Sequence, residues 1–207
     1  MPIGKILFPF MLLLLVIGCA DRPPQNLDNV CSIYKEKRHW YKASLETERK
    51  WGVPPQIPMA FIHQESKFDG TALPPRKYIL WVIPWGRVST AYGFAQAQTM
   101  TWSDYVKDTG NTGAKRNNFS DSIDFIGWYI NKTQKVNGVS KWDAYNQYLN
   151  YHEGWGGYKR KTHNSKSWLI GVAQKVQTRA NSYGSQYRSC KEDLMKPQSI
   201  WEWIFGV

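Results

Sequence analysis

Residues 61–68 read FIHQESKF and directly follow the segment WGVPPQIPMA. Proline suits the first turn of a helix, because its missing N–H would have no partner there. The sequence therefore predicts a short helix that begins at the prolines and ends near Glu65. Met59, Ile62 and Ser66 fall on one face of this helix, which leaves Glu65 at the edge of an apolar face.

The carboxyl group of Glu65 is the first candidate for chemistry. A carboxyl held against apolar surface keeps its proton to a higher pH, since desolvation disfavours the charged form. Such an acid can protonate a leaving oxygen near neutral pH. A solvated helix carboxylate is the ordinary alternative for a single Glu, so the assignment depends on the rest of the chain.

Residues 1–18 have the pattern of a secretory signal peptide. Lys5 gives a basic start, and the apolar run that follows is too short to span a membrane comfortably. The run ends in LVIGC, which resembles a bacterial lipobox and predicts that Cys19 is lipidated and becomes the mature N-terminus. An uncleaved anchor with an incidental cysteine is the alternative. Ala20 after the cysteine favours the outer over the inner membrane of a bacterial envelope, with the protein facing the periplasm.

The remaining two cysteines form a predicted disulfide. The chain has three cysteines, and lipidation of Cys19 leaves the pair Cys31 and Cys190 in an oxidising compartment. Two unpaired buried thiols are the alternative. The disulfide would bracket almost the whole mature domain.

The chain divides into a tether, one domain and a tail. Residues 19–29 are polar and contain prolines, residues 30–190 have the length of a single domain, and residues 191–207 form an aromatic tail. We expect this tail to pack on the domain or to touch a membrane. The net charge of +11 suits an anionic partner such as cell wall or lipid headgroups, and the signal peptide argues against nucleic acid.

Helical periodicity dominates the domain and predicts a mainly α fold. Apolar side chains recur at helical spacing over residues 30–50, 99–109, 120–138, 167–187 and in a stretch that begins at Ala144. We expect glycines at 110 and 138 to end two of these helices. Residues 73–90 and 154–166 break the rhythm with prolines, glycines, aromatic residues and cations, and are predicted to be long irregular loops beside a site.

Three short motifs occur in a fixed order on this helical background. They are Glu65-Ser66, then YGFAQ at residues 92–96, then NYHEG at residues 150–154. In this order they resemble the lysozyme-like domain of the family 1 lytic transglycosylases, the soluble-lytic-transglycosylase type. The resemblance covers roughly residues 45–187 and implies a lysozyme-like helical fold.

The resemblance also implies roles for individual residues. Glu65 matches the catalytic acid/base of the family, and Ser66 matches a partner that helps to orient it. Gly93 and Gln96 match the ends of the second motif, which lines the sugar cleft. Tyr151 matches a tyrosine that sits near the catalytic carboxyl.

The chain departs from the family pattern at several positions. Phe94-Ala95 replaces a Leu-Met pair, His152 stands where Asn is usual, and Glu153 adds a carboxylate. His152 is expected either to tune Glu65 or to fill the Asn site. Glu153 is expected either to make a local hydrogen bond at a helix end or to act as a second acid. The proline- and tryptophan-rich loop at residues 73–90 also lengthens the gap between the first two motifs.

The implied reaction is cleavage of the β-1,4 bond between N-acetylmuramic acid and N-acetylglucosamine in peptidoglycan, with a 1,6-anhydro product and no cofactor. The four histidines lack metal-ligand spacing. One alternative is a hydrolase of the goose-type-lysozyme style, and another is a wall-binding lipoprotein without activity. A third is a factor that opens the wall locally for a cell-envelope assembly.

Overall fold

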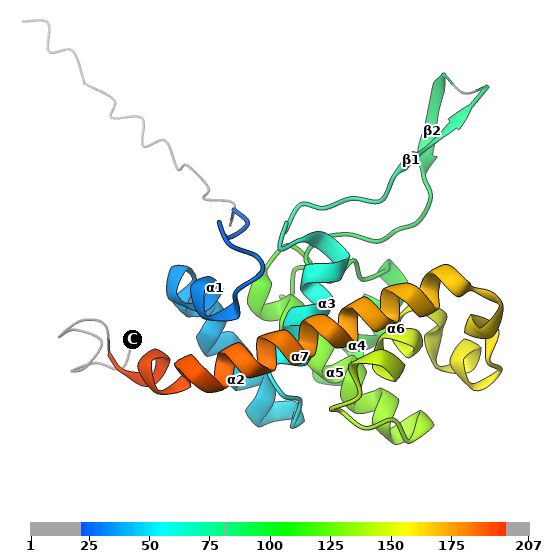
Figure 1. The fold of residues 1–207 in the computed structure, drawn as a ribbon. Helices are drawn as coiled ribbons and strands as arrows, with labels where there is room; N and C mark the ends of the chain where they lie inside the picture. Colours follow the sequence, from blue (N-terminus) through cyan, green and yellow to red (C-terminus); the bar gives the residue numbers. More distant parts are fainter. Residues whose placement is uncertain (1–21, 81, 198–207) are drawn as a thin grey trace, which may run out of the picture.

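A computed structural model describes residues 22–80 and 82–197 of the 207-residue chain. The described chain is mainly helical, which confirms the predicted fold class (Figure 1). The predictions for the signal peptide, for lipidation at Cys19 and for the aromatic end of the tail lie outside the described residues. The predicted domain boundaries stay predictions.

Two helices form the N-terminal part, where the apolar period predicts one. They are α1, Val30–Glu36, and α2, Arg38–Trp51, and the backbone leaves helical geometry at Lys37 (φ −120°, ψ 70°). The apolar pattern continues through this break, because both helices turn a buried face to the same core.

The third helix, α3, is Gln56–Ser66 and lies in the centre of the fold. Its residues 57–62 are all buried, and it packs against α7 and α5. Proline precedes the helix and Pro58 lies in its first turn, as the sequence predicts. Glu65 therefore lies near the end of a helix that makes apolar contacts along most of its length.

Two further helices end at the predicted glycines. Helix α4, Thr99–Thr109, ends at Gly110, and α5, Phe119–Asn137, ends at Gly138. Both glycines are left-handed, with φ of 71° and 69°. A glycine takes this conformation without the cost that a side chain would add.

Helix α6, Ala144–Lys159, carries the third motif. Asp143 caps it by accepting a hydrogen bond from the amide of Asn146 at 2.9 Å. The helix is interrupted at Gly154 (φ 71°, ψ 160°) and is followed by the short 3-10 helix η1, Thr162–Ser165. The prediction of one irregular loop over residues 154–166 is therefore wrong for most of its length, because the chain resumes helical geometry after Gly154.

The last helix, α7, is Ser167–Met195 and crosses the whole body (Figure 1). It runs past the predicted end at residue 187 and past the predicted start of the tail at residue 191, because buried Leu194 continues its apolar face. A disulfide joins Cys31 in α1 to Cys190 in α7 across 159 positions of sequence, as predicted.

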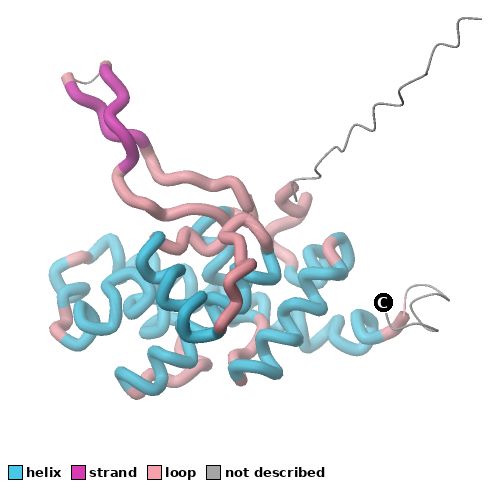
Figure 2. The backbone as a smooth tube through the Cα atoms, turned by 180° about the vertical axis from the view of Figure 1, so that it is seen from behind, coloured by secondary structure: helices cyan, strands magenta, loops and turns pink. Residues whose placement is uncertain are grey.

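The predicted loop at residues 73–90 contains a β-hairpin. Strand β1, Arg76–Ile79, pairs antiparallel with β2, Ile83–Arg87, and the hairpin projects away from the helices (Figure 2). Sequence pattern missed it because strand alternation arises when one face is buried, and here both faces are exposed.

An aromatic cluster ties the first two motifs together. The ring of Trp40 in α2 stacks on Phe119 at 4.1 Å between centroids, and it also contacts Phe68 and Phe94, each at 5.6 Å. All four side chains are buried. Phe68 follows α3 and Phe94 belongs to the second motif, so the cluster fixes the end of α3 against the turn beside it.

Two kinds of feature are absent from the described residues. None of their helices has both the length and the apolar character needed to cross a membrane. Within residues 22–80 and 82–197, no group of three or more His, Cys, Asp and Glu side chains is arranged to hold a metal ion.

Candidate active site

Glu65 lies in the last turn of α3 and is partly buried. Removal of its carboxyl from solvent raises its pKa from 4.5 to about 7, while a hydrogen bond with Tyr148 and the charge of Lys67 oppose the rise. Desolvation dominates, since the charged form loses water that these two partners replace in part. The carboxyl therefore exchanges a proton near neutral pH, as acid–base catalysis requires.

Two tyrosines of α6 form the surroundings of this carboxyl. The ring of Phe61 in α3 packs edge-on against Tyr148 at 5.3 Å and against Tyr151 at 5.4 Å. Burial, and then the charge of Glu65, raise the pKa of both tyrosines above the ordinary value, so both stay neutral. The phenol of Tyr148 is thus an uncharged hydrogen-bonding partner for Glu65.

Sequence reasoning placed Tyr151 near the carboxyl and missed Tyr148 as a partner. Tyr151 donates its hydroxyl hydrogen bond to the carbonyl of Ala95, which joins the third motif to the second. Tyr148 lies one turn earlier on the same helix, and the spacing of three residues was the available signal. The apolar pattern of α6 instead made Tyr148 look like ordinary core.

Ser66 is buried and bonds to its own helix. Its hydroxyl donates to the carbonyl of Ile62 at 3.2 Å. Its expected role in orienting Glu65 stays a prediction. The chain then turns through two left-handed residues, Lys67 (φ 54°) and Phe68 (φ 62°), where side chains are disfavoured. Strain at such positions is common beside functional groups.

The second motif forms a tight turn whose residues have structural roles. Gly93 has φ 76°, and a Cβ atom there would lie 1.9 Å from the carbonyl oxygen of Arg116. The side-chain amide of Gln96 donates to the carbonyls of Ala72 at 2.9 Å and Gly93 at 3.0 Å. Phe94, the departure from the family pattern, fills the aromatic cluster around Trp40.

Residues of the second and third motifs line one cavity of about 250 Å³. Its walls include the predicted site residues Gln96, Tyr151, His152 and Glu153, and two aromatic residues of helix α5 also line it. The structure thus brings four of the predicted residues together, and Tyr151 links this cavity to Glu65.

Glu153 is an ionised carboxylate in a closed network. One oxygen accepts from Lys166 at 2.7 Å and lies 3.1 Å from Nδ1 of His152, and the other accepts from Thr162. Burial alone would raise its pKa, but these hydrogen bonds outweigh burial and lower it to about 2. The side chain of Glu153 is 3% exposed, and both of its oxygens have hydrogen-bonding partners. This fits a carboxylate with a structural role, which is one of the two roles predicted for Glu153.

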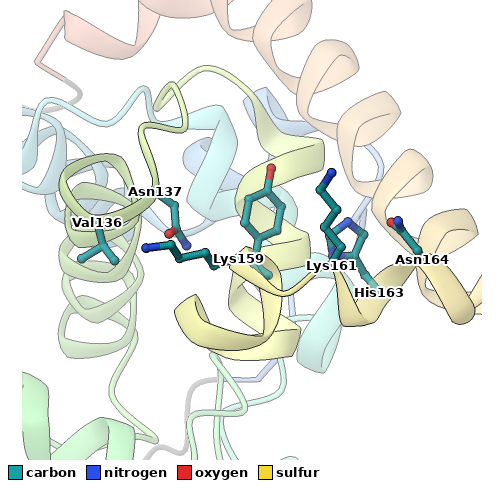
Figure 3. A pocket seen from close by; sticks show the side chains of 7 residues that line it. Val136, Asn137, Lys159, Lys161, His163 and Asn164 are labelled. Carbon is teal, nitrogen blue, oxygen red and sulfur yellow. The ribbon is translucent and has the colours of Figure 1, made fainter.

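Two other cavities lie outside the motif residues. One, of about 680 Å³ between α3 and α7, carries the cations Lys67, Lys175 and Arg179. The other, of about 470 Å³, is bounded by the end of α5, the end of α6 and η1 (Figure 3). Lys159 and Lys161 lie at this second cavity, and Glu65 does not line either one.

Of two comparisons with known proteins, one finds a match. A search of curated proteins finds no match. A family model described as a transglycosylase SLT domain matches residues 7–190, which include all three motifs and every element of the fold up to the disulfide. The chain therefore belongs to the transglycosylase SLT domain family.

Proposed function

We propose that this protein is a peptidoglycan lytic transglycosylase in which Glu65 is the single acid/base. The bond cleaved is the β-1,4 link from N-acetylmuramic acid to N-acetylglucosamine. Membership of a family of peptidoglycan-degrading enzymes supports the substrate class. The observation that carries the mechanism is the pKa of about 7 at a carboxyl held between α3 and two neutral tyrosines of α6.

The reaction needs one carboxyl in two protonation states. Protonated Glu65 gives its proton to the glycosidic oxygen as the bond from that oxygen to C1 of the muramoyl residue breaks. The resulting carboxylate then takes the proton of the muramoyl 6-hydroxyl, whose oxygen attacks C1 and closes the 1,6-anhydro ring. Glu65 ends protonated, and no water is consumed. A pKa near 7 suits both halves of this cycle.

The state of Glu153 favours this reaction over hydrolysis. A hydrolase would use a second carboxyl to activate water or to stabilise the sugar cation. Both oxygens of Glu153 are engaged by Lys166, Thr162 and His152. An internal hydroxyl as nucleophile removes the need for a second acid.

Digestion of purified sacculi tests the proposal. Glu65→Gln keeps the shape of the side chain but cannot cycle a proton, so we expect a loss of at least about a hundredfold in release of muropeptides. Glu153→Gln is the matched control, and its activity should stay within about tenfold of native at a temperature where it remains folded. Mass spectrometry should find 1,6-anhydromuramic ends, which carry one water less than lysozyme products.

Three results would contradict the proposal in different ways. Reducing ends released by a Glu65-dependent enzyme would identify water as the nucleophile, and the goose-type-lysozyme style of hydrolase would replace the transglycosylase. Native activity of Glu65→Gln would remove the site assignment itself. Sacculus binding without release of any fragment would identify a wall-binding protein.

We also propose that the protein is a lipoprotein of the bacterial envelope, anchored through Cys19 and sorted to the outer membrane by Ala20, the residue that follows. The motif LVIGC after the apolar run supports this placement. Cys19→Ser should abolish incorporation of radiolabelled palmitate and move the protein out of the membrane fraction. Unchanged labelling would contradict the lipid anchor, and would leave the reaction at Glu65 untouched.

A further inference from the structure

The hairpin and the chain that leads to it expose an unusual amount of apolar surface. We call residues 73–80 and 82–88 the arm. Eight of its large apolar side chains are exposed, namely Leu73, Tyr78, Ile79, Leu80, Val82, Ile83, Trp85 and Val88. Six of these are aliphatic. The arm stands clear of the helical body in both views (Figures 1 and 2), so no other described element covers this surface.

Within the hairpin, the side chains are ordered by chemistry from the tip to the base, and the exposed Leu73 and Val88 lie outside this order, on the chain between the hairpin and the helical body. The tip carries Ile79, Leu80, Val82 and Ile83, with Leu80 76% exposed and Val82 74% exposed. The exposed rings of Tyr78 and Trp85 come next. The cations Arg76, Lys77 and Arg87 lie toward the base, at the start of β1 and the end of β2. In a bilayer, aliphatic side chains lie in the hydrocarbon core, aromatic rings lie at the interface, and cations lie at the headgroups. The order along the hairpin is the same.

From this order we infer that the arm inserts its tip into an anionic lipid bilayer. The inference is independent of the reaction proposed for Glu65. It concerns where the protein is held, and it adds a contact beyond the predicted lipid at the N-terminus.

Charge complementarity supports lipid headgroups as the partner at the base. The sequence has no Asp or Glu from residue 70 to residue 103. Arg76 lies directly opposite Arg87 in the strand register, and like charges at such positions repel. Arg87 also donates to the carbonyl of Pro74 at 2.7 Å, which orients this guanidinium at the base. Anionic phosphates would relieve the repulsion.

The exposure of both faces of the hairpin argues for a bilayer over a protein groove. A groove or a neighbouring sheet would cover one face or one edge of the strands, whereas hydrocarbon surrounds the tip. Pro84 in β2 has no N–H to offer to an added strand, which blunts that edge. The four aliphatic side chains at the tip have neither a ring to stack on a sugar nor a hydrogen-bonding group for its hydroxyls, so the tip does not fit a wall of the glycan cleft.

The arm lies close to Glu65 in the chain, so its insertion would also limit the distance between the helix of Glu65 and the bilayer. The arm connects the end of α3, which carries Glu65, to the turn at Gly93. The seven steps from residue 73 to residue 80 span at most about 25 Å. Residues 22–29 lie at the upper edge of the body in Figure 1, the edge from which the arm also rises. An inserted arm would therefore hold residue 73, which follows the helix of Glu65 by seven positions, within that reach of the membrane surface.

A fluorescent label at the tip tests the inference. We would place a single thiol by Leu80→Cys in the full chain with Cys19→Ser, because the remaining cysteines are joined in the disulfide. An environment-sensitive label at this thiol is mixed with vesicles of phosphatidylcholine containing phosphatidylglycerol, and with phosphatidylcholine alone. The reference label is Met100→Cys, at an 82% exposed position on α4.

We expect the tip label to shift to the blue, and to be quenched by nitroxide lipids, with the anionic vesicles. The Met100 label should stay in water, which separates insertion of the arm from binding through the N-terminal segment. Val82→Asp should abolish quenching at the tip. Arg76→Gln and Lys77→Gln should each weaken insertion about fivefold. Glu65→Gln should insert like the native chain.

Several outcomes would overturn the inference. A tip label that stays in water with anionic vesicles excludes insertion, and circular dichroism of the labelled chain shows whether it is folded. Equal quenching of both labels shows general adsorption. Protection of the tip label by soluble glycan strands would make the arm part of the substrate cleft instead. Protection by a purified envelope protein, without quenching by lipid, would make it a protein contact.

Discussion

At the scale of single residues, two glutamates show how the same side chain takes opposite roles. Glu65 has few replacements for its lost water, and its pKa rises to about 7. Glu153 is also removed from water, but three hydrogen-bonding partners hold its pKa at about 2. The difference lies in the partners that each fold position supplies. It leaves Glu65 able to exchange a proton near neutral pH and keeps Glu153 a fixed anion.

This contrast predicts opposite effects of two matched substitutions on stability. Glu65 has a folded pKa above its unfolded value, so its favourable contribution is present below pH 4.5 and is lost as pH rises through about 7. Glu65→Gln should therefore raise the free energy of unfolding at pH 8 by up to about 3 kcal/mol, and change it little at pH 4. Denaturant unfolding at the two pH values measures this difference.

Glu153→Gln should behave in the reverse direction. Its folded pKa lies below the unfolded value, so its stabilisation is present above pH 4.5 and is lost as pH falls through about 2. The variant should lose up to about 3 kcal/mol at pH 7, with the loss shrinking toward pH 2. The two variants having the same pH dependence would contradict both environments described for these carboxyls.

The sequence predicted part of this site because its motifs are local. Glu65 and Tyr151 stand within short motifs, and Gly93 and Gln96 belong to one turn. The pairing of Glu153 with Lys166 joins residues thirteen positions apart across a helix break, and nothing in the local pattern indicates it. Tyr148 was missed because an aromatic residue at helical spacing is usually core.

At the scale of elements, the helices were predictable wherever period and end signals agreed. Gly110 and Gly138 end α4 and α5. The break at Lys37 and the hairpin were not predictable. In the first case the apolar period continues across the break, and in the second neither strand has a buried face.

The turn of the second motif yields a prediction about backbone geometry. In Gly93→Ala the new methyl group meets the backbone of Arg116 in addition to the strain of φ 76°, and neither can be relieved by a side-chain movement. We expect the variant to lose about 2–5 kcal/mol of stability, together with activity. Thermal or denaturant unfolding measures the loss of stability, and release of muropeptides measures the loss of activity.

Gly138→Ala is the control for this substitution. Gly138 has a similar φ of 69°, but no atom lies within 4 Å of the added Cβ. It should therefore lose about 1–2 kcal/mol from backbone strain and keep its activity. Equal losses in the two variants would show that close contact at Gly93 does not matter.

At the scale of the whole molecule, the fold is closed by contacts between its two ends. Helix α1 packs against α7, and the disulfide from Cys31 to Cys190 joins them covalently. Helix α7 also packs on α3 and α6, which carry Glu65 and the two tyrosines. Contact with α1 and the disulfide thus hold α7, the outer helix that supports the site. The two cysteines lie outside the site.

This arrangement separates stability from catalysis. A disulfide acts largely on the unfolded chain, and closing a loop of 159 positions corresponds to about 5 kcal/mol in the chain-entropy model. Cys31→Ala with Cys190→Ala should therefore lower the free energy of unfolding by up to that amount. Activity at a temperature well below the transition should stay close to native, since α3 and α6 keep their packing. Cys19→Ser, which leaves the disulfide intact, should unfold like the native chain.

A double variant that unfolds at the native denaturant concentration would show that α1 and α7 stay together in the unfolded ensemble without the bond. A folded double variant without activity would show that the position of α7 sets the geometry at Glu65.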